Sequence, residues 1–169
     1  MHRFCFLCNP SMVLLYAQFL GIGIDMPQIS RSALVPFSAE QMYKLVNDVI
    51  SYPSFLPGCV GSRIISHSPD EMTASVEVSK AGISKTFITK NALEDNKRIH
   101  MQLVEGPFSK LTGGWQFIPL SDDACKIEFH LDFEFSNKLI ELAFGKIFKD
   151  LANNMVQAFT SRAKVVYRV

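Results

Sequence analysis

Two hydrophobic periodicities follow each other in the last part of the chain. Between Cys125 and Phe135 apolar and polar residues alternate, which is the pattern of a strand with one buried face. After Ser136 the apolar residues recur at every third or fourth position as far as Phe159, which is the pattern of an amphipathic helix. A long strand that leads into a long helix, each apolar on one side, predicts a curved antiparallel sheet folded over a single C-terminal helix. Such an arrangement can leave an apolar cavity between the two layers.

The segment before this junction predicts six further strands and two short helices. Ser38 and Gln41 form a capping-box sequence at the start of the first helix, and Pro53 and Pro57 confine the second helix to a short piece. Short turns of hairpin length separate the later strands, which favours antiparallel neighbours. The predicted class is therefore α+β, with an antiparallel seven-stranded sheet wrapped around the C-terminal helix and two short helices after the first strand. The six expected strands are 29–35, 60–66, 72–80, 83–93, 98–104 and 111–120.

The composition is that of one globular domain. The chain has 169 residues, of which 48% are hydrophobic and 20% charged, enough for a substantial core. Residues 26–169 are expected to form a single domain. Residues 1–25 are interpreted as a non-native or disordered extension, with translation beginning at Met26. The apolar run 12–24 is shorter than the roughly 20 residues that cross a bilayer, and a weak membrane anchor is the alternative interpretation.

Charge and cysteine content exclude some classes of function. The formal net charge of +1 gives no overall field that would attract DNA or anionic lipid, so no DNA partner is expected. Basic residues outnumber acidic ones after Ser136, which is either an ordinary solvated helix face or a surface for a phosphate-rich partner. Cys5 and Cys8 lack the second pair that a zinc site needs. The four cysteines form no disulfide framework, which favours a reducing compartment such as the cytoplasm.

The sequence contains no residue pattern typical of a catalytic centre. Nucleophile-elbow, zinc-protease and phosphate-loop motifs are all missing from it. His130 and Asp132 share one face of a strand, where an exposed polar edge is a simpler interpretation than a metal pair. An enzyme of the cyclase type would need polar side chains that project into the cavity, and the pattern suggests no convincing set. The sequence therefore predicts a non-catalytic protein without a metal or a cofactor.

Four segments carry a resemblance to a known family: 51–59 (SYPSFLPGC), 78–87 (VSKAGISKTF), 104–117 (VEGPFSKLTGGWQF) and 125–145 (CKIEFHLDFEFSNKLIELAFG). Together they resemble the START-like superfamily of polyketide cyclases, dehydrases and lipid-transport proteins, and specifically its ubiquinone-binding branch. The resemblance runs from Met26 to about Tyr167 and implies a helix-grip fold with a hydrophobic tunnel. It also implies one of two roles. Mitochondrial and alphaproteobacterial members bind coenzyme Q and support respiration, whereas a gammaproteobacterial toxin binds the large ribosomal subunit and blocks subunit joining.

The first hypothesis is that the tunnel binds ubiquinone or a similar isoprenoid lipid, in the cytoplasm or at the periphery of the inner membrane. Each buried methylene contributes about 0.8 kcal/mol, so a few isoprene units suffice for micromolar binding. Packing in an ordinary core is the simpler interpretation of any single residue. Segment 51–59 is a candidate lid. The candidate ligand-binding residues are Tyr52, Phe55, Leu56, Val78, Phe87, Met101, Leu103, Trp115, Phe117, Phe129, Phe133, Phe144, Phe148, Leu151 and Met155.

The second hypothesis concerns the surface, and it is compatible with the first. Lys80, Lys85 and Lys90 lie around one predicted hairpin and are candidates for binding the large ribosomal subunit. Such binding would weaken steeply with salt, because each neutralised phosphate releases counterions. The near-neutral total charge argues against a strongly basic surface, and three ordinary surface lysines are the simpler interpretation.

Overall fold

The computed structural model describes residues 27–168. Along the chain the elements are β1 (Gln28–Val35), α2 (Ala39–Asn47), the 3-10 helix η1 (Val49–Ser54), β2 (Cys59–His67), β3 (Glu71–Lys80), β4 (Ile83–Glu94), β5 (Arg98–Glu105), β6 (Phe108–Ser121), β7 (Ala124–Phe135) and α3 (Lys138–Tyr167). The predicted fold class and order of elements are confirmed. The expectation that residues 1–25 are an added extension lies outside the described residues.

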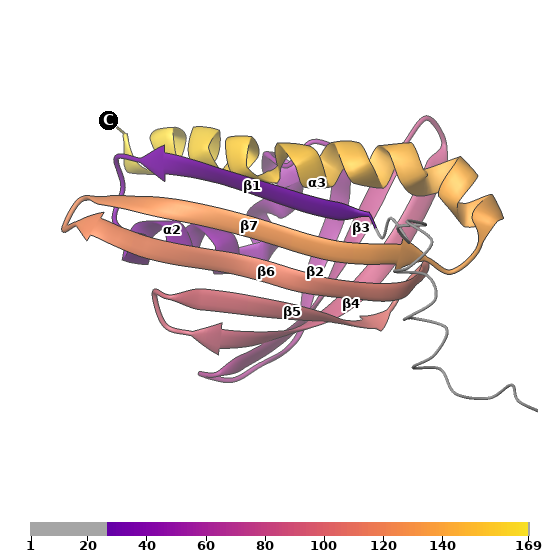
Figure 1. Cartoon of the computed structure of the whole chain (residues 1–169), viewed down its shortest axis with the longest axis horizontal. Helices are drawn as coiled ribbons and strands as arrows, with labels where there is room; N and C mark the ends of the chain where they lie inside the picture. The colour runs from indigo at the N-terminus through magenta and orange to yellow at the C-terminus, as the bar shows by residue number, and fades with distance from the viewer. Residues whose placement is uncertain (1–26, 169) are drawn as a thin grey trace, which may run out of the picture.

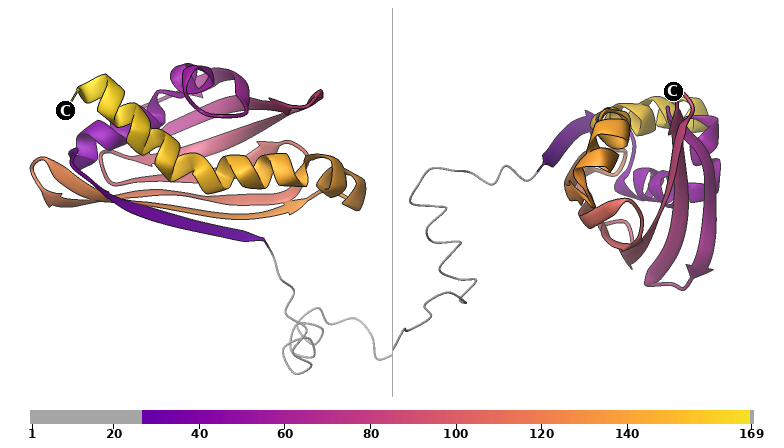
Figure 2. Two further views of the ribbon diagram at one scale, coloured as in Figure 1. Left: turned by 90° about the horizontal axis from the view of Figure 1, so that it is seen from above. Right: turned by 90° about the vertical axis from the view of Figure 1, so that its right-hand side faces the viewer.

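The strands form one antiparallel sheet in the order β1-β7-β6-β5-β4-β3-β2. Only β1 is out of sequence order, because it pairs with β7 along the whole of its length, from Gln28 with Asp132 to Val35 with Cys125. The sheet bends around α3, and α2 and η1 lie at one end of its concave side (Figures 1 and 2). The concave side of the sheet is therefore the one on which a core, and any cavity within it, must lie.

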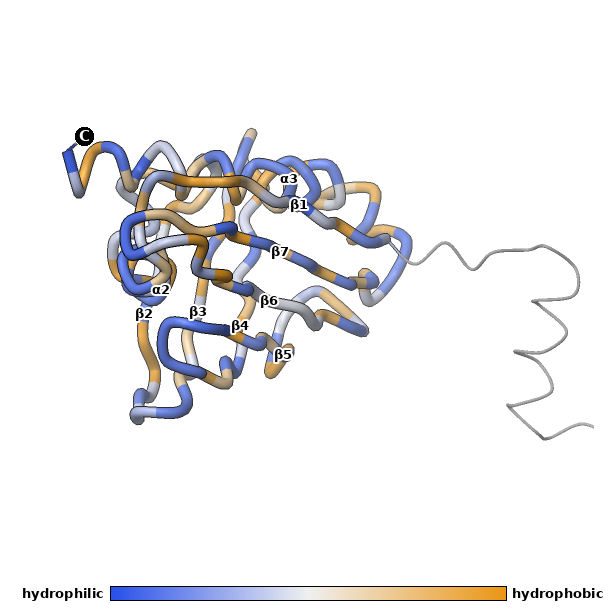
Figure 3. Tube along the Cα trace, turned by 60° about the vertical axis from the view of Figure 1, so that its left-hand side comes forward, coloured by the Kyte–Doolittle hydropathy of each residue, from blue (hydrophilic) through white to orange (hydrophobic). Residues whose placement is uncertain are grey.

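The alternating pattern predicted for β7 is confirmed. Its apolar side chains are buried while the residues between them are half-buried or exposed, and the alternation of polar and apolar positions can be followed along the tube in Figure 3. On α3 the buried positions run from Phe144 to Ala163 at helical spacing. The two predicted apolar faces thus meet each other across the core.

Gly113 and Gly114 of β6 allow the neighbouring strands β7 and β5 to approach closely. Their φ angles of +153° and +149° lie where side chains are rarely found. A Cβ atom on Gly113 would overlap the carbonyl oxygen of His130, and one on Gly114 would overlap that of Ile99. The two glycines therefore serve close packing of the backbone and do not form a phosphate-binding loop.

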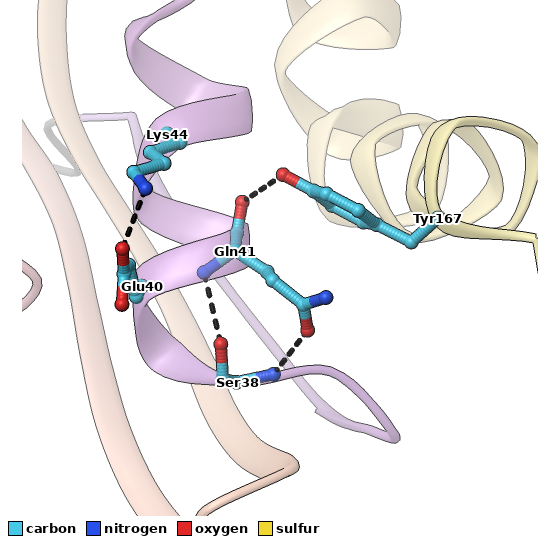
Figure 4. Close-up of polar contacts among 5 residues, drawn as sticks. All are labelled: Ser38, Glu40, Gln41, Lys44 and Tyr167. Carbon is cyan, nitrogen blue, oxygen red and sulfur yellow. Dashed lines mark hydrogen bonds and ion pairs between the residues drawn. The ribbon is translucent and has the colours of Figure 1, made fainter.

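A polar tie joins the two helices that flank the end of the sheet (Figure 4). The Ser38 hydroxyl accepts a hydrogen bond from the Gln41 amide at 3.1 Å, and the Gln41 side chain accepts one from the Ser38 amide at 2.9 Å. This is the predicted capping box. The Tyr167 hydroxyl, in the last turn of α3, donates to the Gln41 carbonyl at 2.8 Å.

No helix of residues 27–168 is both long and apolar enough to span a membrane.

Candidate functional site

A small cavity lies on the concave side of the sheet, under α3. Its volume is about 70 Å³, and its walls come from β3 to β7, from α3, and from α2 and η1 at one end. The lining is mostly apolar. It consists of Val46, Asn47, Val49, Tyr52, Leu56, Ala74, Val76, Phe87, Thr89, Asn91, Ile99, Met101, Leu111, Trp115, Phe129, Leu131, Phe148, Leu151, Ala152 and Met155.

The structure brings most of the candidate ligand-binding residues to this cavity. Those that line it are Tyr52, Leu56, Phe87, Met101, Trp115, Phe129, Phe148, Leu151 and Met155. Those that do not are Phe55, Val78, Leu103, Phe117, Phe133 and Phe144. Alternation along a strand shows that a side chain faces inward, but it does not show which inward positions the helix covers. For all of these residues, contact with a ligand stays a prediction.

Two of the candidates that miss the cavity, Phe133 and Phe144, belong to a cluster of aromatic rings under the first half of α3. Here Phe148 has ring centroids 4.7 Å from Phe108 and 4.9 Å from Phe133. Phe108 and Phe135 stack at 5.2 Å. These five rings fill the space between α3, β6 and β7. Phe148 marks the border of this cluster, because it also lines the cavity.

The segment predicted to be a lid closes the other end of the cavity. The rings of Tyr52 and Phe55 contact Phe159 of α3 edge-on, at centroid distances of 5.3 and 5.1 Å. The Tyr52 hydroxyl donates to the Val46 carbonyl at 2.5 Å, and burial raises the pKa of Tyr52. On the outer side, Phe55 lines a surface groove beneath the Arg162 guanidinium, which lies 5.2 Å from its ring centroid. The Tyr52–Phe55–Phe159 contacts thus separate the cavity from this groove, and movement of the segment stays a prediction.

The cavity has a polar side that was not expected from the sequence. Thr89 and Asn91 of β4 are buried and line it, as does Asn47 at the end of α2. The Asn47 side-chain nitrogen donates to the Tyr43 carbonyl at 3.2 Å. The alternation along β4 could have revealed the polar lining, because Thr89 and Asn91 lie two and four residues after Phe87 and therefore on the same inward face. The sequence pattern suggested no polar set for the cavity, whereas the structure places Asn47, Thr89 and Asn91 in its lining.

The lining offers hydrogen bonds but little acid–base chemistry. It contains amides, a hydroxyl and the Tyr52 phenol, whose pKa burial raises further above neutrality. Within residues 27–168 no group of three or more His, Cys, Asp or Glu side chains is placed to hold a metal ion. His130 and Asp132, considered above as a pair, lie 3.3 Å apart on the other face of the sheet. What this site can do chemically is hold an apolar molecule and pair with a polar group on it.

The three candidate lysines are not brought onto one face. Lys85 pairs across the hairpin with Val78 and so lies on the concave face of the sheet, half-buried. Lys90 lies on the convex face, where its ammonium pairs with the Glu71 carboxylate at 3.0 Å. Lys80 is exposed at the hairpin tip. Their role in binding a ribosome stays a prediction.

Comparison with known proteins shows the class to which this fold and cavity belong. The family model described as "Polyketide cyclase / dehydrase and lipid transport" matches residues 35–160, and the chain belongs to this family. The ribosome association toxin RatA of Escherichia coli K12 is 70% identical over 155 residues, which cover 92% of this chain and 98% of the toxin. A mitochondrial coenzyme Q-binding protein, COQ10 homolog B of Xenopus laevis, is 29% identical over 86% of this chain and 62% of that protein.

Solved structures support the fold independently of these relatives. The Zhui aromatase/cyclase from a Streptomyces species superposes with a TM-score of 0.75 at 15% identity, over 85% of this chain and 97% of the other. At this identity the likeness shows the fold alone. The START-like helix-grip fold predicted from the sequence is confirmed. The family contains both cyclases and lipid-transport proteins, so membership does not by itself decide whether the cavity is catalytic.

Proposed function

We propose that this chain is a non-catalytic binding protein that holds an isoprenoid lipid, most simply ubiquinone, in the cavity under α3. The observation that carries this proposal is an internal, mostly apolar cavity in a family that includes lipid-transport proteins. The relative named as a coenzyme Q-binding protein supports the choice of a quinone. Such a ligand resides in membranes, so transient contact of a cytoplasmic protein with the inner membrane is part of the proposal.

The size of the cavity implies that the ligand must open it. A cavity of about 150 Å³ is known to hold benzene, and typical ligand pockets are several times larger. The cavity here, at about 70 Å³, is too small for a substituted quinone ring. Met101 and Met155 line it and have flexible side chains that can repack. Displacement of Phe55, which separates the cavity from the outer groove, would add further space. The proposal therefore requires the cavity to widen as the ligand enters.

The chemistry of the lining supports binding without catalysis. General acid–base catalysis needs a group whose pKa lies near the working pH, and the lining side chains include no carboxylate, imidazole or thiol. The Tyr52 phenol donates a hydrogen bond to the Val46 carbonyl, and burial raises its pKa, which keeps the phenol neutral. These groups can orient a ligand, but none of them is suited to move a proton at neutral pH.

The first test is ligand capture by the full chain. Mass spectrometry of the protein purified from a quinone-containing bacterial host should find an isoprenoid near one per chain. Titration of the delipidated protein with decylubiquinone should quench Trp115, which is the only tryptophan and lines the cavity.

A pair of matched variants makes this test specific to the cavity. Ala74→Leu fills the cavity and should raise the dissociation constant for decylubiquinone at least tenfold. Ala92→Leu places the same side chain on the exposed face of the neighbouring strand and should leave the quenching unchanged. A protein that neither carries an isoprenoid nor takes up decylubiquinone contradicts the proposal.

Ribosome association is a second candidate function, favoured by the 70% identity to RatA over nearly the full length of that toxin. It would use the outer surface and so is compatible with a filled cavity. We propose docking on the large ribosomal subunit, with inhibition of subunit joining as its consequence. The basic side chains available for rRNA include exposed Lys80, Lys146 and Lys164.

Co-sedimentation with purified large subunits tests this second function. Binding through phosphate contacts should fall steeply as salt is raised from about 50 to 200 mM. The triple change of Lys80, Lys85 and Lys90 to Glu should weaken it if the predicted residues take part. Changing Lys97, Lys110 and Lys126 to Glu alters the net charge equally and serves as the control. Unchanged co-sedimentation of the first variant removes these three lysines from the interface, and no co-sedimentation of the wild type contradicts ribosome association itself.

A further inference from the structure

A groove lies on the surface outside the segment that closes the cavity. Its volume is about 620 Å³. Phe55 lines this groove and contacts the ring of Tyr52, which lines the cavity. A molecule in the groove would therefore touch the same pair of rings that separates the groove from the cavity. The lining residues are Ser54, Phe55, Pro57, Asn154, Gln157, Ala158, Ser161, Arg162 and Val165.

Arg162 gives this groove a positive charge that no described residue balances. It is the only charged residue in the lining. Within residues 27–168 no carboxylate lies within ion-pair distance of its guanidinium, and its Nε atom is buried without a hydrogen-bond partner. A charged group that is partly withdrawn from water normally has such partners. The groove therefore suits an anion.

The remaining lining residues indicate which anion fits. The hydroxyls and amides of the lining can bind a polar head group, while Phe55, Pro57 and Val165 form an apolar side. Val165 is 64% exposed. A phosphate ion, or the phosphate of an RNA backbone, would leave these apolar side chains uncovered. A phospholipid carries its phosphate next to acyl chains and matches both sides of the groove.

The geometry at Arg162 also suits a phosphate. The guanidinium carbon lies 5.2 Å from the centroid of the Phe55 ring. Because the Nε atom is covered, a ligand in the groove would meet the two terminal nitrogens instead. A planar guanidinium can donate two parallel hydrogen bonds to a phosphate. Such charge-assisted bonds are stronger than the attraction of a cation to an exposed ring face.

We propose that this groove binds the phosphate of an anionic phospholipid at a membrane surface through Arg162, and that the bound phosphate draws the guanidinium away from Phe55. Phe55 then loses one of its contacts and moves more easily, which opens the way between the groove and the cavity. This second step rests on the proposed binding of an isoprenoid lipid in the cavity. The docking step does not depend on it.

Vesicle flotation with the full chain tests the docking step. Vesicles made of equal parts of phosphatidylglycerol and phosphatidylcholine should carry the protein, and vesicles of phosphatidylcholine alone should not. Dihexanoylphosphatidylglycerol should compete with the vesicles, whereas inorganic phosphate at the same concentration should not. Equal or absent binding to the two kinds of vesicle overturns the inference. Equally strong competition by inorganic phosphate also overturns it, because the groove would then be a site for the free ion.

Three variants locate the docking site. Arg162→Gln should weaken vesicle binding about tenfold, in line with the loss of a hydrogen bond to a charged group. Lys164→Gln removes the same charge from an exposed residue outside the groove and should weaken binding far less. Arg162→Lys keeps the charge and should retain part of the binding, which separates loss of charge from a folding defect. Equal losses in Arg162→Gln and Lys164→Gln would mean a diffuse effect of charge and would overturn the inference.

The rate of ligand uptake tests the second step. The quenching of Trp115, which lines the cavity, follows the transfer of decylubiquinone from vesicles to the protein. Transfer should be several times faster from vesicles that contain phosphatidylglycerol, and this ratio of rates should fall to near one in Arg162→Gln but not in Lys164→Gln. Vesicle binding without faster transfer overturns the second step. A protein that takes up no decylubiquinone, with or without vesicles, contradicts the proposed function and leaves flotation as the test of docking.

Discussion

The two halves of the sheet pack against α3 in different ways. Under the first half of α3, strands β6 and β7 present large rings, and Phe108, Phe133 and Phe135 fill the layer together with Phe144 and Phe148 of the helix. Across the sheet, β3 and β4 present side chains of mixed size to the same core, among them Ala74, Thr89 and Asn91 but also the ring of Phe87. The backbone is continuous between the two halves. The cavity therefore lies where small side chains such as Ala74 and Thr89 face α3 beside the larger rings of Phe87 and Trp115.

Because of this difference, the ring cluster contributes mainly to stability and the cavity side to the proposed ligand binding. Burying a whole aromatic side chain contributes about 1.5–3 kcal/mol, so the ring cluster is a major source of stability. The side with Ala74, Thr89 and Asn91 contributes less and includes an unpaired acceptor. Well-packed cores need no such group, whereas functional sites often sacrifice some stability. The comparison predicts that substitutions in the two halves will affect different measurements.

The largest effect is expected in the ring cluster. Phe133→Ala removes a side chain that is 1% exposed and leaves a space that its neighbours cannot fill. The free energy of unfolding should fall by about 3–5 kcal/mol. Met101→Ala, on the cavity side, removes a half-buried side chain next to space that already exists, and it should cost clearly less. Urea denaturation followed by circular dichroism measures both. Equal losses would contradict the proposed division between the halves.

A smaller effect is expected at Tyr52, on the border of the cavity. Tyr52→Phe keeps the ring contacts with Phe55 and Phe159 but removes the hydrogen bond to the Val46 carbonyl. The free energy of unfolding should fall by about 1–1.5 kcal/mol near pH 8.

The same variant should also change the pH dependence of stability. Burial raises the pKa of Tyr52 above the ordinary value of 10.0 that the unfolded chain retains. Stability is therefore complete below pH 10 and is lost as the pH rises above it, because only the unfolded chain releases the proton. The loss is about 1.4 kcal/mol per pH unit for one proton. Between pH 9 and 11 the wild type should lose more stability than Tyr52→Phe, in which the other tyrosines are unchanged. Parallel losses in the two proteins would show that Tyr52 ionises freely in the fold.

The cavity side should tolerate a change that the ring cluster would not. Asn91→Leu removes the unpaired acceptor and adds apolar surface beside the cavity, so the free energy of unfolding should rise by about 1 kcal/mol. Ser75→Ala, equally buried but outside the cavity, should change stability little. Thermal unfolding of the ligand-free proteins tests this. A marked loss of stability in Asn91→Leu would show that the amide supports the fold.

Sequence periodicity predicted the apolar faces of β7 and α3 that meet in the core. It did not predict which inward-facing residues line the cavity and which belong to the ring cluster. The alternation in β7 and the helical spacing in α3 placed Phe129, Phe133 and Phe148 inside, as the structure confirms. Whether an inward ring borders the cavity depends on which helix residue lies opposite. That depends on the crossing of α3 over the sheet, which no local pattern encodes. Thr89 and Asn91 could not be placed for a different reason. They share the period of the inward-facing Phe87, but polar residues at that period are as typical of an exposed strand face.

The smallest effect is expected far from both halves, at the tie between α3 and α2. Tyr167→Phe removes the hydrogen bond to the Gln41 carbonyl (Figure 4) but keeps the ring near Phe37, at a centroid distance of 5.9 Å. Because the residue is only half-buried, water can replace the lost partner. The cost should be about 0.5–1 kcal/mol. Hydrogen exchange should quicken in the last turn of α3 while protection in β7 and in the turns around Phe148 stays the same. Faster exchange throughout α3 would instead mean that the tie holds the whole helix against the sheet, and that the cavity depends on it.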